Sequence, residues 1–172
     1  MAATRSKNLR FIWLTLALLG LGLAYYGWQV LNQAKPAPDF KLTNLQGQTI
    51  SSDAMRGKVV MLNFWATSCT TCVAEMPEMV ATYNKYHQQG LEFFAVAMSY
   101  DPPNYVVNFA ETRKLPFHVV LDTQGQIARS FNEVKLTPTT YVLDKQGRIL
   151  KRYVGKPDFN ELHRLIETQL KA

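Results

Sequence analysis

The sequence predicts an α/β domain in which a central β-sheet is covered by helices on both faces. Two apolar runs, residues 59–66 and 91–98, contain no Gly or Pro and predict buried strands. Segments of helical periodicity separate the strands in the order β-α-β-α-β-α-β-β-α, which is typical of a layered α/β arrangement. Cys69 and Cys72 follow the first of these strands as a Cys-x-x-Cys pair, which indicates a thiol–disulfide site.

Length and composition fit one domain of ordinary size with an appendage. The chain has 172 residues, of which 47% are hydrophobic and 12% aromatic. Its formal charge of +6 is shared equally: residues 1–34 hold three of the 19 basic residues and none of the 13 acidic ones, so this segment and the rest of the chain each carry +3. Because the sequence contains no basic cluster, nucleic acid is not indicated as a partner.

An apolar segment, residues 11–30, precedes the domain, and no charged residue occurs between Arg10 and Lys35. About 20 apolar residues are enough to span a bilayer as a helix. Trp and Tyr residues near the two ends are typical of membrane interfaces, and the basic residues before the segment predict a cytoplasmic position for residues 1–10. We therefore expect a single transmembrane anchor at 11–30.

A linker at 31–37 and a domain at 38–172 follow from this assignment. The alternative is a cleaved secretory signal, because Gly22-Leu23-Ala24 resembles a cleavage site. Against cleavage, the apolar run is longer than a typical signal core and continues past that site. Both interpretations carry residues 35–172 across the membrane.

The start of the domain predicts a hairpin and a helical turn. Residues 40–42 and 48–51 can pair around a turn at 44–47, which would form an N-terminal β-hairpin extension. Residues 52–56 then predict one helical turn that Gly57 stops. The central strand at 59–66 follows.

The helix after the central strand is expected from residue 70 to residue 88, with Gly90 as its C-terminal glycine. Pro77 should kink this helix, because its ring removes one N–H and collides with the preceding turn. The later elements are separated by breaks at 101–103, 122–125 and 144–147: strands at 91–98, 117–121, 139–143 and 149–154, and helices at 104–114, 126–132 and 159–170. The last of these helices is amphipathic.

The Cys pair lies where a helix begins, and this position predicts different roles for the two sulfurs. Cys69 would lie at the helix N-terminus, where unpaired N–H groups and the helix dipole favour a thiolate. Cys72 lies one turn deeper on the same face, within reach of a disulfide bond. Cys69 is therefore predicted to attack and Cys72 to resolve.

The Cys pair has two other interpretations. A closed zinc site would lack ligands, because the chain has only these two cysteines and its three histidines lie far apart in the sequence. A purely structural disulfide would close so short a loop that it would remove little entropy from the unfolded chain.

The residues around the pair resemble those of the thioredoxin superfamily, and more closely those of the TlpA/ResA-like membrane-tethered thiol–disulfide oxidoreductases. The matching residues extend over roughly 37–170 and comprise Ala37-Pro38-Asp39-Phe40, Asn63-Phe64-Trp65-Ala66-Thr67 before Cys69 and Cys72, Glu75 and Pro77 after them, and Thr137-Pro138-Thr139-Thr140. The resemblance implies a thioredoxin fold with a central mixed β-sheet.

The resemblance also implies a substrate-binding set. Pro138 would follow a cis peptide bond and face the disulfide, leaving the Thr137 backbone free to pair with a substrate strand beside Cys69. Trp65 would cover the site as an apolar lid. The alternatives are a trans Pro at an ordinary strand start for Pro138, and a core aromatic residue for Trp65.

The resemblance assigns the acid–base role to Glu75. Thioredoxins proper carry a buried Asp on the central strand, and Asn63 occupies that position here. Glu75 lies three residues after Cys72 on the same helix face. The alternative is an ordinary solvated glutamate, which is the interpretation we give to Glu78, one turn further on.

The chain departs from many relatives between and before the cysteines, where Ser68 and Thr70-Thr71 replace a Trp and a Pro. The residues between the cysteines help to set the reduction potential. The direction of electron flow, as a reductase or as a thiol oxidant, therefore stays open.

We expect an enzyme that needs no cofactor and no metal, anchored in the bacterial inner membrane with its catalytic domain on the periplasmic side. Its expected partners are disulfides of envelope proteins, with cytochrome c maturation as one setting, and a membrane electron donor. The alternative is a thioredoxin-like copper-binding protein. Such proteins carry a Cys-x-x-x-Cys motif, whereas the two cysteines of this chain are one residue closer together. A peroxiredoxin motif fits neither cysteine, because the required Pro and Thr are absent before both.

Overall fold

A computed structural model describes Trp13, Leu16 and residues 18–23, 25–26 and 34–172 of the chain. The chain divides into two units, Met1–Ala34 and Lys35–Ala172. The described residues of the first unit are helical apart from Ala34. Within the described residues, no helix has the length and apolar character needed to cross a bilayer. Half of the predicted anchor at 11–30 lies outside those residues, so the anchor stays a prediction.

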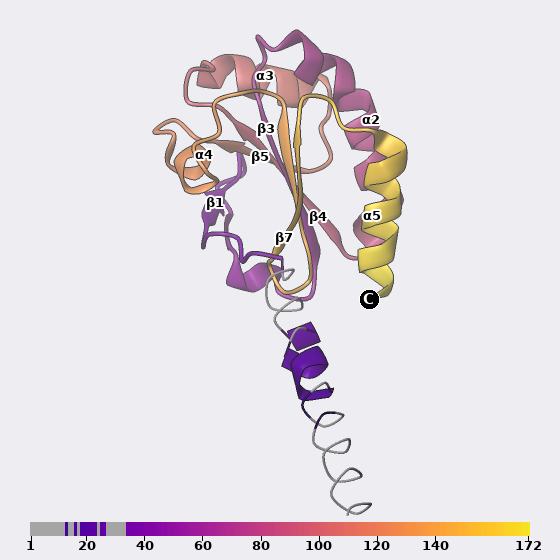
Figure 1. Ribbon diagram of the computed structural model, residues 1–172. Coiled ribbons are helices and arrows are strands. Elements are labelled where there is room, and N and C mark those ends of the chain that lie inside the picture. Colours follow the sequence, from indigo (N-terminus) through magenta and orange to yellow (C-terminus); the bar gives the residue numbers. More distant parts are fainter. Residues whose placement is uncertain (1–12, 14–15, 17, 24, 27–33) are drawn as a thin grey trace, which may run out of the picture. The chain divides into compact units, whose positions relative to one another are not determined.

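A five-stranded mixed sheet forms the centre of the second unit, as expected for the predicted fold. Two of its four strand pairings are parallel and two are antiparallel. The order across the sheet is β5 (His118–Leu121), β4 (Leu91–Ala97), β3 (Val59–Trp65), β6 (Thr139–Leu143) and β7 (Ile149–Val154). Figure 1 shows these strands between two layers of helices.

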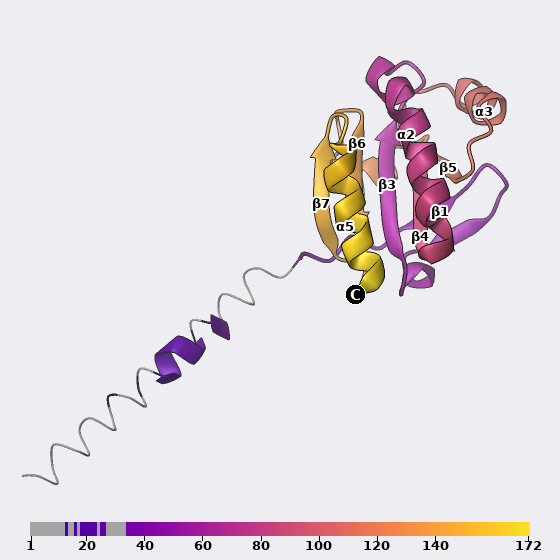
Figure 2. The same cartoon turned by 90° about the vertical axis from the view of Figure 1, so that its right-hand side faces the viewer.

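The helices cover both faces of the sheet. Their bounds are α2 (Thr70–Tyr86), α3 (Pro103–Thr112), α4 (Gln126–Ser130) and α5 (Phe159–Lys171). Helices α2 and α5 lie side by side on one face, with α4 and strand β1 (Lys41–Thr43) on the other (Figures 1 and 2). The predicted α/β architecture is thus confirmed.

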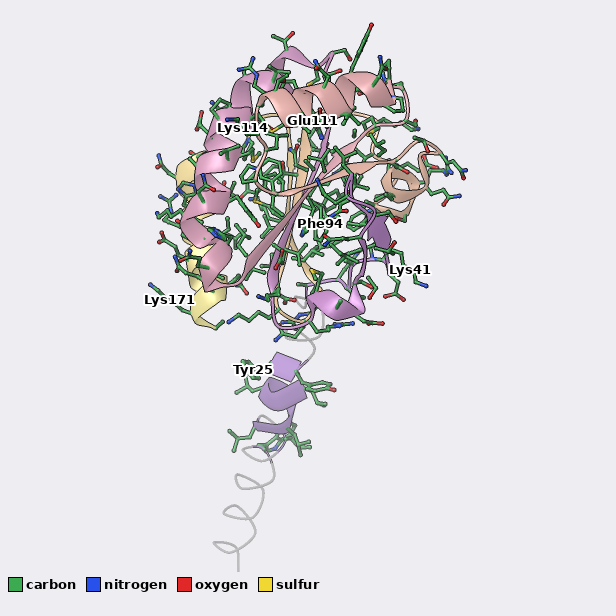
Figure 3. All side chains as sticks on the ribbon, turned by 180° about the vertical axis from the view of Figure 1, so that it is seen from behind. Tyr25, Lys41, Phe94, Glu111, Lys114 and Lys171 are labelled. Atoms are coloured by element: carbon green, nitrogen blue, oxygen red, sulfur yellow. A yellow bond between two sulfur atoms is a disulfide. The ribbon has the colours of Figure 1, made fainter. Side chains whose placement is uncertain are left out.

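Strand β3 supplies both cores because its side chains alternate between the two faces. Val59, Met61 and Trp65 join the core under α2 and α5, where Cys72 and Ile166 also pack. The opposite core contains the alternate β3 residues, Val60, Leu62 and Phe64, which pack with Phe94 and Phe131. Phe94 lies in the interior, whereas Lys41 and Lys171 lie at the surface (Figure 3).

Helix α2 carries the Cys pair at its first turn. It continues through Pro77 without a break and ends at Tyr86, followed by a 3₁₀ turn, η2 (His87–Gln89). Gly90 closes this turn in the left-handed region, with φ of 108°, which a residue without Cβ adopts at little cost. The helix therefore ends two residues earlier than the sequence predicted, because its last turn tightens.

A second, two-stranded sheet precedes the central one. Strand β1 pairs antiparallel with β2 (Thr49–Ser51), and a 3₁₀ turn, η1 (Asp53–Met55), follows. The buried Asn44 holds the connecting turn: its Oδ1 accepts the N–H groups of Gln46 and Gln48, at 3.1 and 2.9 Å. The Leu45 N–H donates to the Val119 carbonyl at 3.0 Å, which attaches this turn to β5.

Candidate active site

The two cysteines form a disulfide where β3 passes into α2. The sulfurs of Cys69 and Cys72 are bonded at 2.13 Å, and the Cα atoms lie 5.2 Å apart. Cys69 is the N-cap residue of α2, and its Sγ accepts a hydrogen bond from the Cys72 N–H at 3.2 Å. Cys69 is half-buried, whereas Cys72 is fully buried.

This asymmetry favours Cys69 as the sulfur that meets a substrate. An N-cap side chain lies beside N–H groups that have no partner within the helix, and these stabilise negative charge. The Cys72 N–H is such a donor, so it would stabilise a thiolate on reduced Cys69. Cys72 lacks exposed surface and can act only on a group already bound at Cys69.

Glu75 lies buried in the next turn of the helix, with no exposed surface. Its Oε1 accepts a hydrogen bond from Asn63 Nδ2 at 3.1 Å, and the same nitrogen donates to Thr140 Oγ1 at 2.9 Å. Oε2 has no protein partner. The carboxyl group is therefore held on one side by a polar row across β3 and β6, where Asn63 and Thr140 are register partners.

Burial raises the pKa of Glu75 from 4.5 to about 7. Desolvation is the largest cause, because the charged form loses its water. The hydrogen bond from Asn63 and the positive charge of Lys156 oppose this effect, while Glu78 adds to it slightly. Glu75 is thus not the solvated glutamate of the alternative interpretation, and it exchanges a proton near neutral pH.

Glu78, by contrast, lies at the surface and is ion-paired. Its Oε1 accepts a hydrogen bond from Lys156 Nζ at 2.6 Å, and both side chains are about half exposed. Such a pair contributes little to stability. The interpretation of Glu78 as a surface residue agrees with this placement.

The Thr137–Pro138 peptide bond is cis, as the resemblance implies. Pro138 is buried, and its carbonyl accepts the Gly155 N–H at 2.8 Å. Thr137 is half-buried and precedes the first residue of β6. The neighbouring Leu136 is 63% exposed, so the loop before β6 presents an apolar side chain to solvent.

Trp65 does not form an exposed lid. Its side chain is fully buried in the core under α2, where its ring packs 5.2 Å from that of Phe109. The position of Trp65 on β3 explains why it is not a lid, because its side chain lies on the same face of the strand as those of Met61 and Asn63, under α2. A substrate therefore cannot contact the Trp65 ring in this structure, and the core-aromatic alternative describes it.

Two further residues, Asp101 and Tyr100, contact segments of the site and were not predicted from the sequence. Both oxygens of the buried Asp101 accept hydrogen bonds from Thr67, one from its N–H and one from its hydroxyl, each at 2.6 Å. The Tyr100 and Thr137 hydroxyls pair at 3.2 Å. These contacts join residues 34 and 37 positions apart, and local sequence carries no signal for them.

No group of three His, Cys, Asp or Glu side chains that could hold a metal ion occurs among the residues that the structure describes. The site itself offers a cysteine pair and a carboxyl group one turn further along the helix. It can transfer two electrons between a dithiol and a disulfide, with Glu75 as the proton acceptor or donor.

Comparisons with known proteins agree with this chemistry. A model of the Redoxin family matches residues 32–166. The thiol-disulfide oxidoreductase ResA of Geobacillus thermodenitrificans is 37% identical over 128 residues, covering 72% of this chain and 73% of that protein. The ResA protein of Geobacillus kaustophilus is 44% identical over 96 residues, covering 56% of this chain and only about half, 55%, of its own length.

A solved structure is also similar. The crystal structure of a thioredoxin-family thiol:disulfide interchange protein from Chlorobium tepidum has a TM-score of 0.73 and 27% sequence identity, and the match covers 80% of this chain and 97% of that one. The family model extends over more than half of the chain, and the Geobacillus thermodenitrificans ResA protein is matched over more than two thirds of both chains. The chain therefore belongs to the redoxin family, as a ResA-like member of the thioredoxin superfamily.

Proposed function

We propose that the protein is an extracytoplasmic thiol–disulfide oxidoreductase that reduces disulfides in proteins of the cell envelope. One observation carries this proposal: a half-buried cysteine at a helix N-cap lies beside a buried cysteine, with a buried carboxyl group one turn further along. The activity named for the ResA relatives supports it.

The first step is attack by the reduced form of Cys69. Its thiolate displaces one sulfur of a substrate disulfide, so that a mixed disulfide forms and one substrate thiolate leaves. The Thr137 backbone, beside the cis Pro138, would pair with the substrate chain, as the family resemblance implies. Figure 2 shows β6, which begins directly after this loop, next to β3, the central strand of the sheet.

The second step is resolution by Cys72. Its thiol gives a proton to the Glu75 carboxylate, and the new thiolate attacks Cys69 Sγ in the mixed disulfide. The second substrate thiolate leaves, and the Cys69–Cys72 disulfide forms. Two electrons pass from the protein to the substrate, and the leaving thiolate takes up a proton.

The protein must then regain two electrons, and a dithiol donor at the membrane is the partner that supplies them. Apocytochrome c is a candidate substrate among envelope proteins, as the ResA-like resemblance suggests. If the protein instead oxidises thiols, the same steps run in reverse. The reduction potential of the Cys69–Cys72 pair, compared with that of the substrate, decides the direction.

A trapping experiment tests the proposal. Without Cys72 the mixed disulfide cannot be resolved, so Cys72→Ser should accumulate disulfide-linked complexes with envelope proteins, while Cys69→Ser should not. Non-reducing electrophoresis of membrane extracts, followed by reduction and mass spectrometry, gives the measurement. Complexes formed equally by both variants would contradict the assigned roles, and complexes formed only by Cys69→Ser would reverse them.

Glu75→Gln should change how stability depends on pH. In the unfolded chain Glu75 ionises near pH 4.5, and in the native protein near pH 7. Burial therefore destabilises the native state increasingly as the pH rises between these values, reaching about 3 kcal/mol. The variant should be more stable than wild type by up to about that amount at pH 8, with no difference near pH 4.

Urea unfolding of the oxidised protein at several pH values measures this effect. The exposed Glu78 provides the matched control, because Glu78→Gln should leave the pH dependence nearly unchanged. A constant difference between wild type and Glu75→Gln at every pH would show that Glu75 does not titrate near 7.

Glu75→Gln should also slow the resolving step. The amide keeps the shape of the carboxyl group but cannot accept the Cys72 proton, and a general base typically contributes ~10²–10⁴-fold. We expect disulfide exchange to slow by at least about tenfold and to lose its rise through pH 7. Stopped-flow reduction of a disulfide substrate across pH 5–9 checks this; wild-type rates in a folded Glu75→Gln protein would exclude the role.

The anchor proposal has its own test. Residues 11–30 are apolar and follow Arg5, Lys7 and Arg10, which supports a single-pass anchor with its N-terminus inside. A C-terminal alkaline phosphatase fusion should be active and should stay in the membrane fraction. Recovery of a soluble mature protein that begins near Tyr25 would replace the anchor by a cleaved signal.

A further inference from the structure

Two turns lie next to each other at the carboxyl ends of β3 and β4. In the first, the Cys69 N–H donates to the Ala66 carbonyl at 3.1 Å; in the second, the Asp101 N–H donates to the Met98 carbonyl at 2.9 Å. The Met98 N–H also donates to the Trp65 carbonyl at 3.0 Å, so the second turn starts beside the first. The first turn delivers Cys69 to the helix.

Asp101 fastens the second turn to the first. Its carboxylate accepts two hydrogen bonds of 2.6 Å from Thr67, which is the residue after Ala66 in the Cys69 turn. Asp101 is 5% exposed, and charge-assisted hydrogen bonds shielded from water are strong and directional. The backbone of Thr67 is therefore fixed two residues before the attacking sulfur.

Tyr100 connects the same turn to a third segment. Its hydroxyl pairs with Thr137 Oγ1 at 3.2 Å, directly before the cis Pro138. Two consecutive residues thus hold two different loops: Asp101 holds the Cys69 turn, and Tyr100 holds the loop before β6.

We propose that Asp101 and Tyr100 are positioning residues that keep Cys69 and Thr137 in register for a polypeptide substrate. The inference rests on the proposed function and specifies its substrate class. A polypeptide must place its disulfide at Cys69 and its backbone at Thr137 at the same time. A small disulfide needs only the sulfur of Cys69, so it is indifferent to where the Thr137 loop lies.

The test compares two substrates, insulin and the small reagent hydroxyethyl disulfide. Asp101→Asn removes the charge that strengthens both hydrogen bonds to Thr67. The amide oxygen can still accept the Thr67 N–H and the amide nitrogen can donate to Thr67 Oγ1, but both bonds are then neutral and weaker. We expect kcat/KM for insulin to fall about tenfold, because small displacements of reacting groups have large effects on rate. The rate with the small disulfide should stay within about twofold.

Two further variants separate the contacts. Thr67→Val removes the hydroxyl without changing any charge and should lower the insulin rate selectively, while Thr67→Ser keeps the hydroxyl and should restore it. Tyr100→Phe removes only the link to Thr137 and should raise KM for insulin. Thr67 is half-buried and Tyr100 is exposed, so these variants should fold and can test the proposal even if Asp101→Asn folds poorly.

Asp122→Asn is the matched control. Asp122 is also buried and its two oxygens accept the N–H groups of Ile127 and Ala128, at 3.2 and 2.8 Å, but it holds α4 and not the Cys69 turn. It should lose stability without changing the ratio of the two rates.

The outcomes distinguish the two proposals. Wild-type rates with both insulin and the small disulfide in Asp101→Asn, Thr67→Val and Tyr100→Phe would overturn the positioning role and leave the proposed function intact. An equal fall with both substrates would also overturn it, because Asp101 would then act on Cys69 alone. A wild-type protein that reduces neither disulfide would refute the proposed function and the inference with it.

Discussion

The burial of β3 on both faces is the constraint on which the domain and its site both depend. All seven residues of this strand are buried, and its parallel and antiparallel neighbours leave it no free edge. A strand in that position must turn at its end, and the turn places Cys69 at the N-terminus of α2. The same strand directs Asn63 toward the helix, where it is the hydrogen-bond donor to Glu75. Packing and chemistry therefore use the same seven residues.

The acid of this site lies on the helix and not on the strand, and its surroundings explain how it remains buried. A buried carboxyl group without a charged partner is tolerated when it can stay protonated. Asn63 satisfies one oxygen without carrying a charge, whereas a second carboxylate at that position would repel the first. The Lys156–Glu78 pair at the surface places opposite charges nearby, and their effects on Glu75 oppose each other.

Local patterns predicted most of the fold, and long-range contacts account for what they missed. The strands β6 and β7 have the predicted bounds, because turn residues mark their ends. Cys69 and Cys72 could be assigned from spacing alone, and the cis bond before Pro138 from a family resemblance. Trp65 was misplaced because a strand residue at the end of an apolar run can point inward or outward. The Asp101–Thr67 contact had no local signature, since its strength comes from burial that only the assembled sheet creates.

The wide separation of the site's parts along the chain has a consequence for how the protein matures. The Cys pair and its helix turn are local, but the Asn63–Thr140 bond joins residues 77 positions apart, and β6 can pair with β3 only after most of the chain is present. Contacts between distant segments form late in folding because their loop entropy must be overcome first. The site is therefore completed only when β6 joins the sheet: the two cysteines are neighbours in any conformation of the chain, but the Asn63–Thr140 contact and the loop before β6 reach them only in the assembled domain.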